Sequence, residues 1–249
     1  MRTPSKRVSS LFVAGISTLM LVTPFTSLSA ASSSTGTFCT SLPTIESTVS
    51  AQVTKRTQAL STNRANAAAK LASERASVDA TVAADWAKWD NQRQTQFSKL
   101  SAKATTSTQQ TALATFESTV TGAVSSRRDA VTQARDTYRA GVDSTIAARQ
   151  SQVDGYVSTF ESSIQAAASA ATSACNTGTT PSTVRTNFVA AMKAARLSFN
   201  SSVSTVPSIT STVQALAATR KTATSSADNS YKTTITQAAA TLKSALGQK

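Results

Sequence analysis

Apolar side chains recur every eleven residues over most of the chain. One series consists of Val49, Leu60, Leu71 and Val82, and a second of Val120, Val131, Val142, Val153, Ile164 and Cys175. Eleven residues fill three helical turns at about 3.67 residues per turn, close to an ordinary α-helix, so each series lies along one helix face. The pattern therefore predicts two long helices, each with a narrow apolar stripe.

The two stripes match if the second helix runs antiparallel to the first. The residue numbers add up to 213 in the pairs Val49 with Ile164, Leu60 with Val153, Leu71 with Val142, Val82 with Val131 and Phe97 with Phe116. For Cys39 and Cys175 they add up to 214. Such a hairpin turns near residue 107, inside the polar stretch "KATTSTQQ" (residues 103–110). We therefore predict a helical hairpin over residues 32–175, with a Cys39–Cys175 disulfide across its open end.

Residues 176–249 continue the helical spacing of apolar positions. They are Val184, Phe188, Met192, Ala195, Phe199, Val203 and Val206, followed by Ile209, Val213, Leu216, Ala227, Tyr231, Ile235, Ala238, Leu242 and Leu246. Pro207 lies between the two runs, and proline breaks or kinks a helix because it lacks the backbone N–H. Since the stripe passes Pro207 with little change of phase, we expect a third, kinked helix along the hairpin. The alternative is a separate short hairpin.

Three glycines, Gly122, Gly141 and Gly155, interrupt the second predicted helix, where glycine is unfavourable. Close approach of the third helix would explain them. The expected fold class is thus all-α: a long antiparallel hairpin with a third helix packed along it, as in an elongated three-helix bundle.

The first 31 residues have the pattern of an export signal. A basic start (Arg2, Lys6, Arg7) precedes an apolar run at residues 11–22 and small residues at 29–31. The run is shorter than the roughly 20 residues that span a bilayer, so a retained anchor is less favoured, and no later segment looks apolar enough to cross a membrane. We expect a signal peptide over residues 1–31 and a mature chain in the cell envelope, periplasm or medium, where disulfides are permitted.

The sequence offers little for catalysis. It contains no histidine, and both of its cysteines are predicted to be bonded. No glycine-rich phosphate loop or activated-serine motif is present. Most carboxylates have Lys or Arg three or four residues away, the spacing of surface ion pairs within a helix. We therefore expect no catalytic, cofactor-binding or metal-binding residues, and a protein that is not an enzyme.

Trp86 and Trp89 stand out because only 5% of the residues are aromatic. The antiparallel register places Trp86 opposite Arg127 and Trp89 opposite Val124. We expect both rings to thicken the core near the turn, with the Arg127 guanidinium over an indole face. The alternative is a patch that binds a partner.

Positive charge is concentrated near the C-terminus. The chain has a formal net charge of +13, and residues 176–249 contain one acid, Asp228. Lys221, Lys232 and Lys243 are eleven residues apart and, with Arg220, are candidates for polyanion binding. The simpler interpretation is a solvated face that aids solubility. Nucleic acid is a less favoured partner than an anionic envelope polymer, since no aromatic residues for base stacking are interleaved with the lysines.

Two segments, "RRDAVTQARDTYRAGVDSTIAAR" (residues 127–149) and "VQALAATRK" (residues 213–221), resemble secreted, Ala-rich long-helix proteins of unknown function from poorly characterised bacteria. The resemblance implies a helical fold and an extracytoplasmic location, and it implies no site. We expect a structural or interaction protein: a rigid helical spacer or adaptor that binds a protein or an anionic envelope polymer. The alternatives are a chaperone-like holding module and a helix protein that binds polyanions or lipid surfaces.

Overall fold

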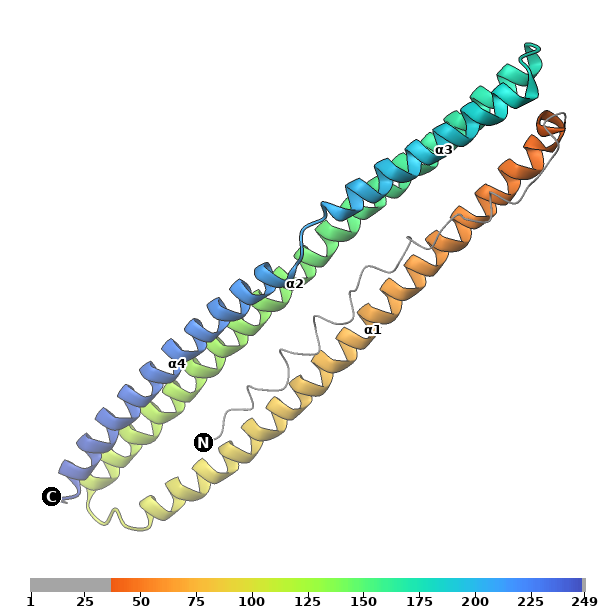
Figure 1. The fold of residues 1–249 in the computed structure, drawn as a ribbon. Coiled ribbons are helices and arrows are strands. Elements are labelled where there is room, and N and C mark those ends of the chain that lie inside the picture. Colours follow the sequence, from red (N-terminus) through yellow and green to blue (C-terminus); the bar gives the residue numbers. More distant parts are fainter. Residues whose placement is uncertain (1–36, 248–249) are drawn as a thin grey trace. The chain divides into compact units, whose positions relative to one another are not determined.

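The computed structural model describes residues 37–247, so the predicted signal peptide lies outside the described residues. The described chain forms four α-helices: α1 (Phe38–Ser101), α2 (Ser107–Asn176), α3 (Pro181–Ser204) and α4 (Thr210–Ala245) (Figure 1). Between residues 37 and 247 there is no β-strand. The predicted all-α class is confirmed.

The turn between α1 and α2 occupies residues 102–106 and overlaps the first half of the predicted polar stretch, whose remaining residues begin α2. At the end of this turn, α2 begins with a capping box, which is a reciprocal pair of hydrogen bonds at a helix start. The Gln109 backbone N–H donates to Thr106 Oγ1 (3.3 Å), and Gln109 Oε1 accepts from the Thr106 backbone N–H (3.3 Å). The stretch therefore both ends one helix and starts the next.

Helix α2 is closed by a Schellman motif that contains Gly178, two residues after its last helical residue. Gly178 has φ +79°, its N–H donates to the Cys175 carbonyl (3.3 Å), and the Thr179 N–H donates to the Ala174 carbonyl (3.0 Å). A positive φ is easy only for glycine, which explains the residue type. Pro181 then starts α3 in the first helical turn, where its missing N–H costs nothing.

The expectation of one kinked third helix is wrong, because α3 ends at Ser204 and α4 begins at Thr210. Pro207 lies in the middle of the five intervening residues and cannot donate the backbone hydrogen bond that would continue the helix. The Thr205 hydroxyl donates to the Ser202 carbonyl (2.7 Å), which helps to close the last turn of α3. The guanidinium of Arg149 on α2 donates to the Pro207 carbonyl.

The described chain divides into two compact units. Unit 1 contains residues 37–72 and 147–208, and unit 2 contains residues 73–146 and 209–247. Helix α3 therefore belongs to unit 1 and helix α4 to unit 2.

The core of unit 1 joins the start of α1, the end of α2 and the start of α3. Its buried members are Phe38, Leu42, Ala167, Ala171, Val184 and Phe188. The ring centroids of Phe38 and Phe188 are 5.9 Å apart, and those of Phe160 and Phe199 are 5.2 Å apart. Alanines supply much of the α2 side, so the helices approach closely and the core is thin.

The core of unit 2 lies where the turn meets the end of α4. It contains Ala104, Leu113 and Leu242, flanked by Leu100, Ala112, Phe116 and Leu246. Phe97 on α1 and Phe116 on α2 pack edge to face, with centroids 6.1 Å apart. This contact confirms the predicted pairing of the two residues.

The glycine expectation is confirmed at one of three positions. A Cβ atom at Gly141 would lie 2.7 Å from Leu216 Cδ2 of α4, so a side chain there would collide with Leu216. At Gly122 and Gly155 an added Cβ would meet nothing within 4 Å, and the packing explanation is wrong for both.

Within residues 37–247, no helix combines the length and apolar character that a membrane crossing requires.

Candidate interaction surfaces

Arginine–aspartate contacts join α1 to α2 in unit 2. Asp79 accepts hydrogen bonds from Arg139 (2.8 Å) and Arg135 (3.0 Å) of α2. Arg75 donates to both carboxylate oxygens of Asp143, each at 2.8 Å. In unit 1, Arg64 of α1 donates to Asp154 of α2 at 2.7 Å. The sequence-based expectation of ion pairs within single helices is therefore wrong for Asp79 and Asp143, whose partners lie on the other helix.

Asp90 is the most strongly perturbed carboxylate in this set. It accepts from Arg128 of α2 at 2.6 Å and from Arg93 of its own helix at 2.7 Å. The hydrogen bond from Arg128 is the main cause that lowers the pKa of Asp90 to about 2, although partial burial opposes the shift. The carboxylate therefore stays ionised far below neutral pH.

Asp79 behaves similarly. The hydrogen bond from Arg139 lowers the pKa of Asp79, and the same contact raises the pKa of Arg139. Both groups remain charged across the physiological range, which suits a permanent tie between helices. Bidentate contacts of this kind also favour one register, because a one-residue slip would separate the partners.

The expected position of Arg127 over an indole ring is wrong. The neighbouring Arg128 takes that position: its Cζ lies 5.1 Å from the Trp86 ring centroid, and its Nη2 donates to the Trp86 carbonyl at 3.2 Å. Arg127 instead turns to α4, where it bonds Asp228 at 2.6 Å and lies 5.7 Å from the Tyr231 ring centroid. Successive residues on a helix point about 100° apart, so adjacent arginines reach different helices.

The two tryptophans have different environments. Trp86 is half-buried beneath Arg128, whereas 45% of the surface of Trp89 is exposed. Val78, one eleven-residue repeat before Trp89 on α1, is 39% exposed. Trp86 therefore contributes to the contact between helices, whereas Trp89 and Val78 are two separate exposed apolar side chains about 16 Å apart along α1.

The basic residues predicted on α4 also separate into two groups. Lys221, Lys232 and Lys243 are exposed. Arg220 lies over Tyr138 of α2, with its Cζ 4.6 Å from the ring centroid, and is only partly exposed. The structure thus places the three lysines on an outer face and Arg220 in the contact between α4 and α2.

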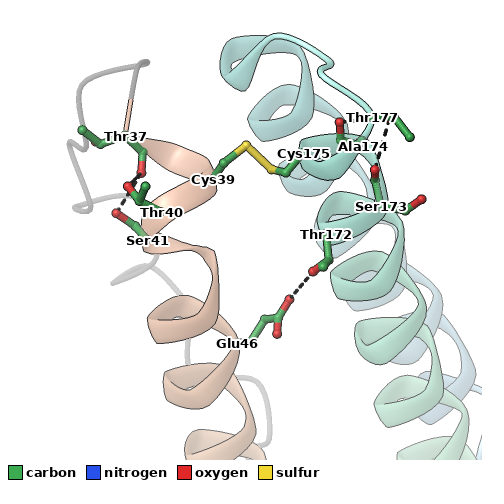
Figure 2. The surroundings of a disulfide bond; sticks show 10 residues. All are labelled: Thr37, Cys39, Thr40, Ser41, Glu46, Thr172, Ser173, Ala174, Cys175 and Thr177. Atoms are coloured by element: carbon green, nitrogen blue, oxygen red, sulfur yellow. Dashed lines mark hydrogen bonds between the residues drawn. A yellow bond between two sulfur atoms is a disulfide. The ribbon is translucent and has the colours of Figure 1, made fainter.

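The disulfide end of unit 1 is the third surface (Figure 2). Cys39 and Cys175 are bonded, with their Cα atoms 5.8 Å apart, which confirms the predicted pairing. Nearby, Thr172 of α2 donates to Glu46 of α1 at 3.2 Å. A shallow groove beside this contact is lined by Glu46, Gln165, Ala168, Ser169, Thr172, Ser173, Asn176 and Thr177. No motif in the sequence indicates this groove, because its lining residues are ordinary small and polar helix residues.

Within the described residues, no three His, Cys, Asp or Glu side chains gather closely enough to hold a metal ion. No protein-family model, curated protein or solved structure is significantly similar to this chain.

Proposed function

We propose that this protein is a non-enzymatic structural and interaction protein of the cell envelope or extracellular space. In this proposal the long paired helices form a rigid rod, which acts as a spacer or adaptor. The observation that carries the proposal is the length of the uninterrupted helices: α1 has 64 residues and α2 has 70. At 1.5 Å per residue, α1 alone extends about 96 Å.

The connections between α1 and α2 support a mechanical role. The capped turn joins the end of α1 to the start of α2, and the Cys39–Cys175 bond joins their other ends. Between these connections, arginine–aspartate contacts and the apolar stripe resist sliding of one helix along the other. A pair of helices tied in this way transmits force or maintains a distance better than a single helix, which bends easily.

The location outside the cytoplasm is supported by two independent features. The basic and apolar pattern of residues 1–31 is typical of an export signal. A disulfide is typical of proteins that fold in an oxidising compartment.

Small-angle X-ray scattering of the oxidised mature chain tests the rod. A rod about 100 Å long has a radius of gyration near 30 Å, whereas a compact globule of the same length of chain would have about 17 Å. We expect a value near 30 Å and a maximum dimension near 100 Å. A radius of gyration close to 17 Å would overturn the spacer proposal, because it is the value expected of a compact globule.

A further inference from the structure

The outward face of α4 carries exposed charges of one sign. Lys221, Lys232 and Lys243 are exposed and eleven residues apart. Eleven residues are three turns, so the lysines follow one line along the helix with about 16 Å between neighbours.

The structure turns the opposite charge away from this line. Asp228 is the single acidic residue of α4, and its carboxylate accepts a 2.6 Å hydrogen bond from Arg127 of α2. Arg220 is also directed to α2, where it lies over Tyr138. The exposed face of α4 therefore presents the three lysines, while the Asp228 carboxylate, which could have neutralised one of them, is bonded to Arg127.

The same difference between arginine and lysine holds over the rest of the described chain: arginines form ion pairs and lysines are exposed. Every ion pair found within residues 37–247 uses arginine. The described lysines are exposed and take part in none of these pairs: Lys55, Lys70, Lys88, Lys99, Lys103, Lys193, Lys221, Lys232 and Lys243. Six of these eight arginine pairs connect two helices, and the lysines of α4 remain available to an external anion.

The surface between these lysines is polar and uncharged. Its exposed side chains are Thr222, Ser225, Ser226, Asn229, Thr233, Thr236 and Gln237. The one aromatic residue of α4, Tyr231, is half-buried beneath Arg127. The large exposed apolar residues of the described chain lie on α1 and α3, not on α4. Hydroxyl and amide groups suit a ligand rich in hydroxyl groups. Ala240 is also exposed between the lysines, but this surface has no large apolar side chain that could enter a lipid layer.

We propose that this face of α4 binds an anionic polysaccharide that lies along the helix, with its carboxylates at the lysines and its hydroxyl groups at the intervening polar residues. Duplex DNA fits less well, since it carries one charge per roughly 1.7 Å of axis against one lysine per about 16 Å here. Single-stranded nucleic acid would need aromatic stacking, which this face does not offer. The inference rests on the proposed function, because it names the envelope partner of the spacer.

The test uses the oxidised mature chain and soluble polygalacturonate as the probe, with calorimetry at 20 mM and 150 mM NaCl. The variant K221Q/K232Q/K243Q replaces the three lysines of α4 with uncharged glutamine. The matched control K88Q/K99Q/K103Q removes three exposed lysines from α1 and its turn in the same unit, with the same change of net charge. We expect the α4 variant to bind at least tenfold more weakly and the control to bind within about twofold of the unmodified protein. Affinity of the unmodified protein should fall with salt, with a log–log slope no steeper than about −3 for three lysines.

Three results would overturn the inference. One is no binding at 20 mM NaCl, and another is an equal loss in both variants, which would indicate a response to net charge alone. The third is tighter binding to duplex DNA or to anionic phospholipid vesicles than to polygalacturonate. Scattering of the same variants separates this test from that of the spacer, because surface Lys→Gln changes should leave the radius of gyration unaltered.

Discussion

Asp90 lies between two guanidinium groups, with Arg128 at 2.6 Å and Arg93 at 2.7 Å. Its pKa of about 2 lies below the ordinary value of 3.8 that it regains on unfolding. A depressed folded-state pKa gives stabilisation that is complete above the unfolded pKa and is lost as pH falls through the folded pKa. We therefore predict that urea-measured free energy of unfolding declines between about pH 4 and pH 2, and that Asp90→Asn shows a smaller decline.

The control for this prediction is Asp129→Asn, which alters an exposed carboxylate on α2 that has no ion pair within residues 37–247. It should keep the decline of the unmodified protein. If Asp90→Asn and Asp129→Asn show the same pH dependence, the Arg128 contact does not stabilise the fold through ionisation.

The α2 glycines provide a second test at single positions. Gly155→Ala adds a Cβ atom in open space, so the better helix propensity of alanine should raise the free energy of unfolding by about 0.5–1 kcal/mol. Gly141→Ala should gain less or lose stability, because the Leu216 side chain would have to move. Urea denaturation of the two variants, with Gly122→Ala as a second open site, gives the comparison. Equal gains at all three positions would show that Leu216 moves aside without cost.

The tryptophans allow a third test, which separates packing from partner binding. Trp86→Ala should lower the free energy of unfolding by about 2 kcal/mol, because it removes a half-buried ring and its cation–π contact with Arg128. Trp89→Ala should cost less than about 1 kcal/mol, since much of that ring is exposed. Thermal denaturation measures both changes. A larger loss for Trp89→Ala would assign that ring to the core and end its candidacy as a partner patch.

At the scale of elements, the helix ends show why boundaries could be read from the chain. The capping box at Thr106 and Gln109, the glycine at 178 and the proline at 181 each use a residue type with a specific backbone or hydrogen-bonding property. Pro207 also indicates correctly where the helical segment is interrupted. Whether the helix would bend or stop there was not predictable, since that depends on what the flanking turns pack against.

The disulfide is an element-scale constraint because it joins the first turn of α1 to the last turns of α2, 136 residues apart. In the chain-entropy model such a loop contributes about 5 kcal/mol through the unfolded state. We predict that Cys39→Ala/Cys175→Ala lowers the melting temperature. Amide hydrogen exchange should become faster in residues 38–50 and 165–176 and change little in residues 104–116. An equally large increase in residues 104–116 would contradict a local role of the bond in unit 1.

At the scale of the whole molecule, the division into two units assigns α3 and α4 to different neighbours. The sequence pattern predicts one continuous apolar stripe over residues 182–246, because the apolar positions before and after Pro207 have the same helical spacing. Spacing describes one helix face and contains no information about which partner covers it. Only the packing of Phe188 in unit 1 and of Leu242 in unit 2 distinguishes the two segments.

The sequence by itself determined the helical class, the position of the turn between α1 and α2, and the pairings of Cys39 with Cys175 and of Phe97 with Phe116. These features follow from periodicity and backbone preference, which belong to the chain before it folds. Tertiary structure alone decided which arginine covers Trp86, which carboxylates bond across helices and which glycine meets α4. A long arginine side chain can reach its own helix or either neighbour, so its partner depends on a rotation of about 100° per residue and on where the next helix lies.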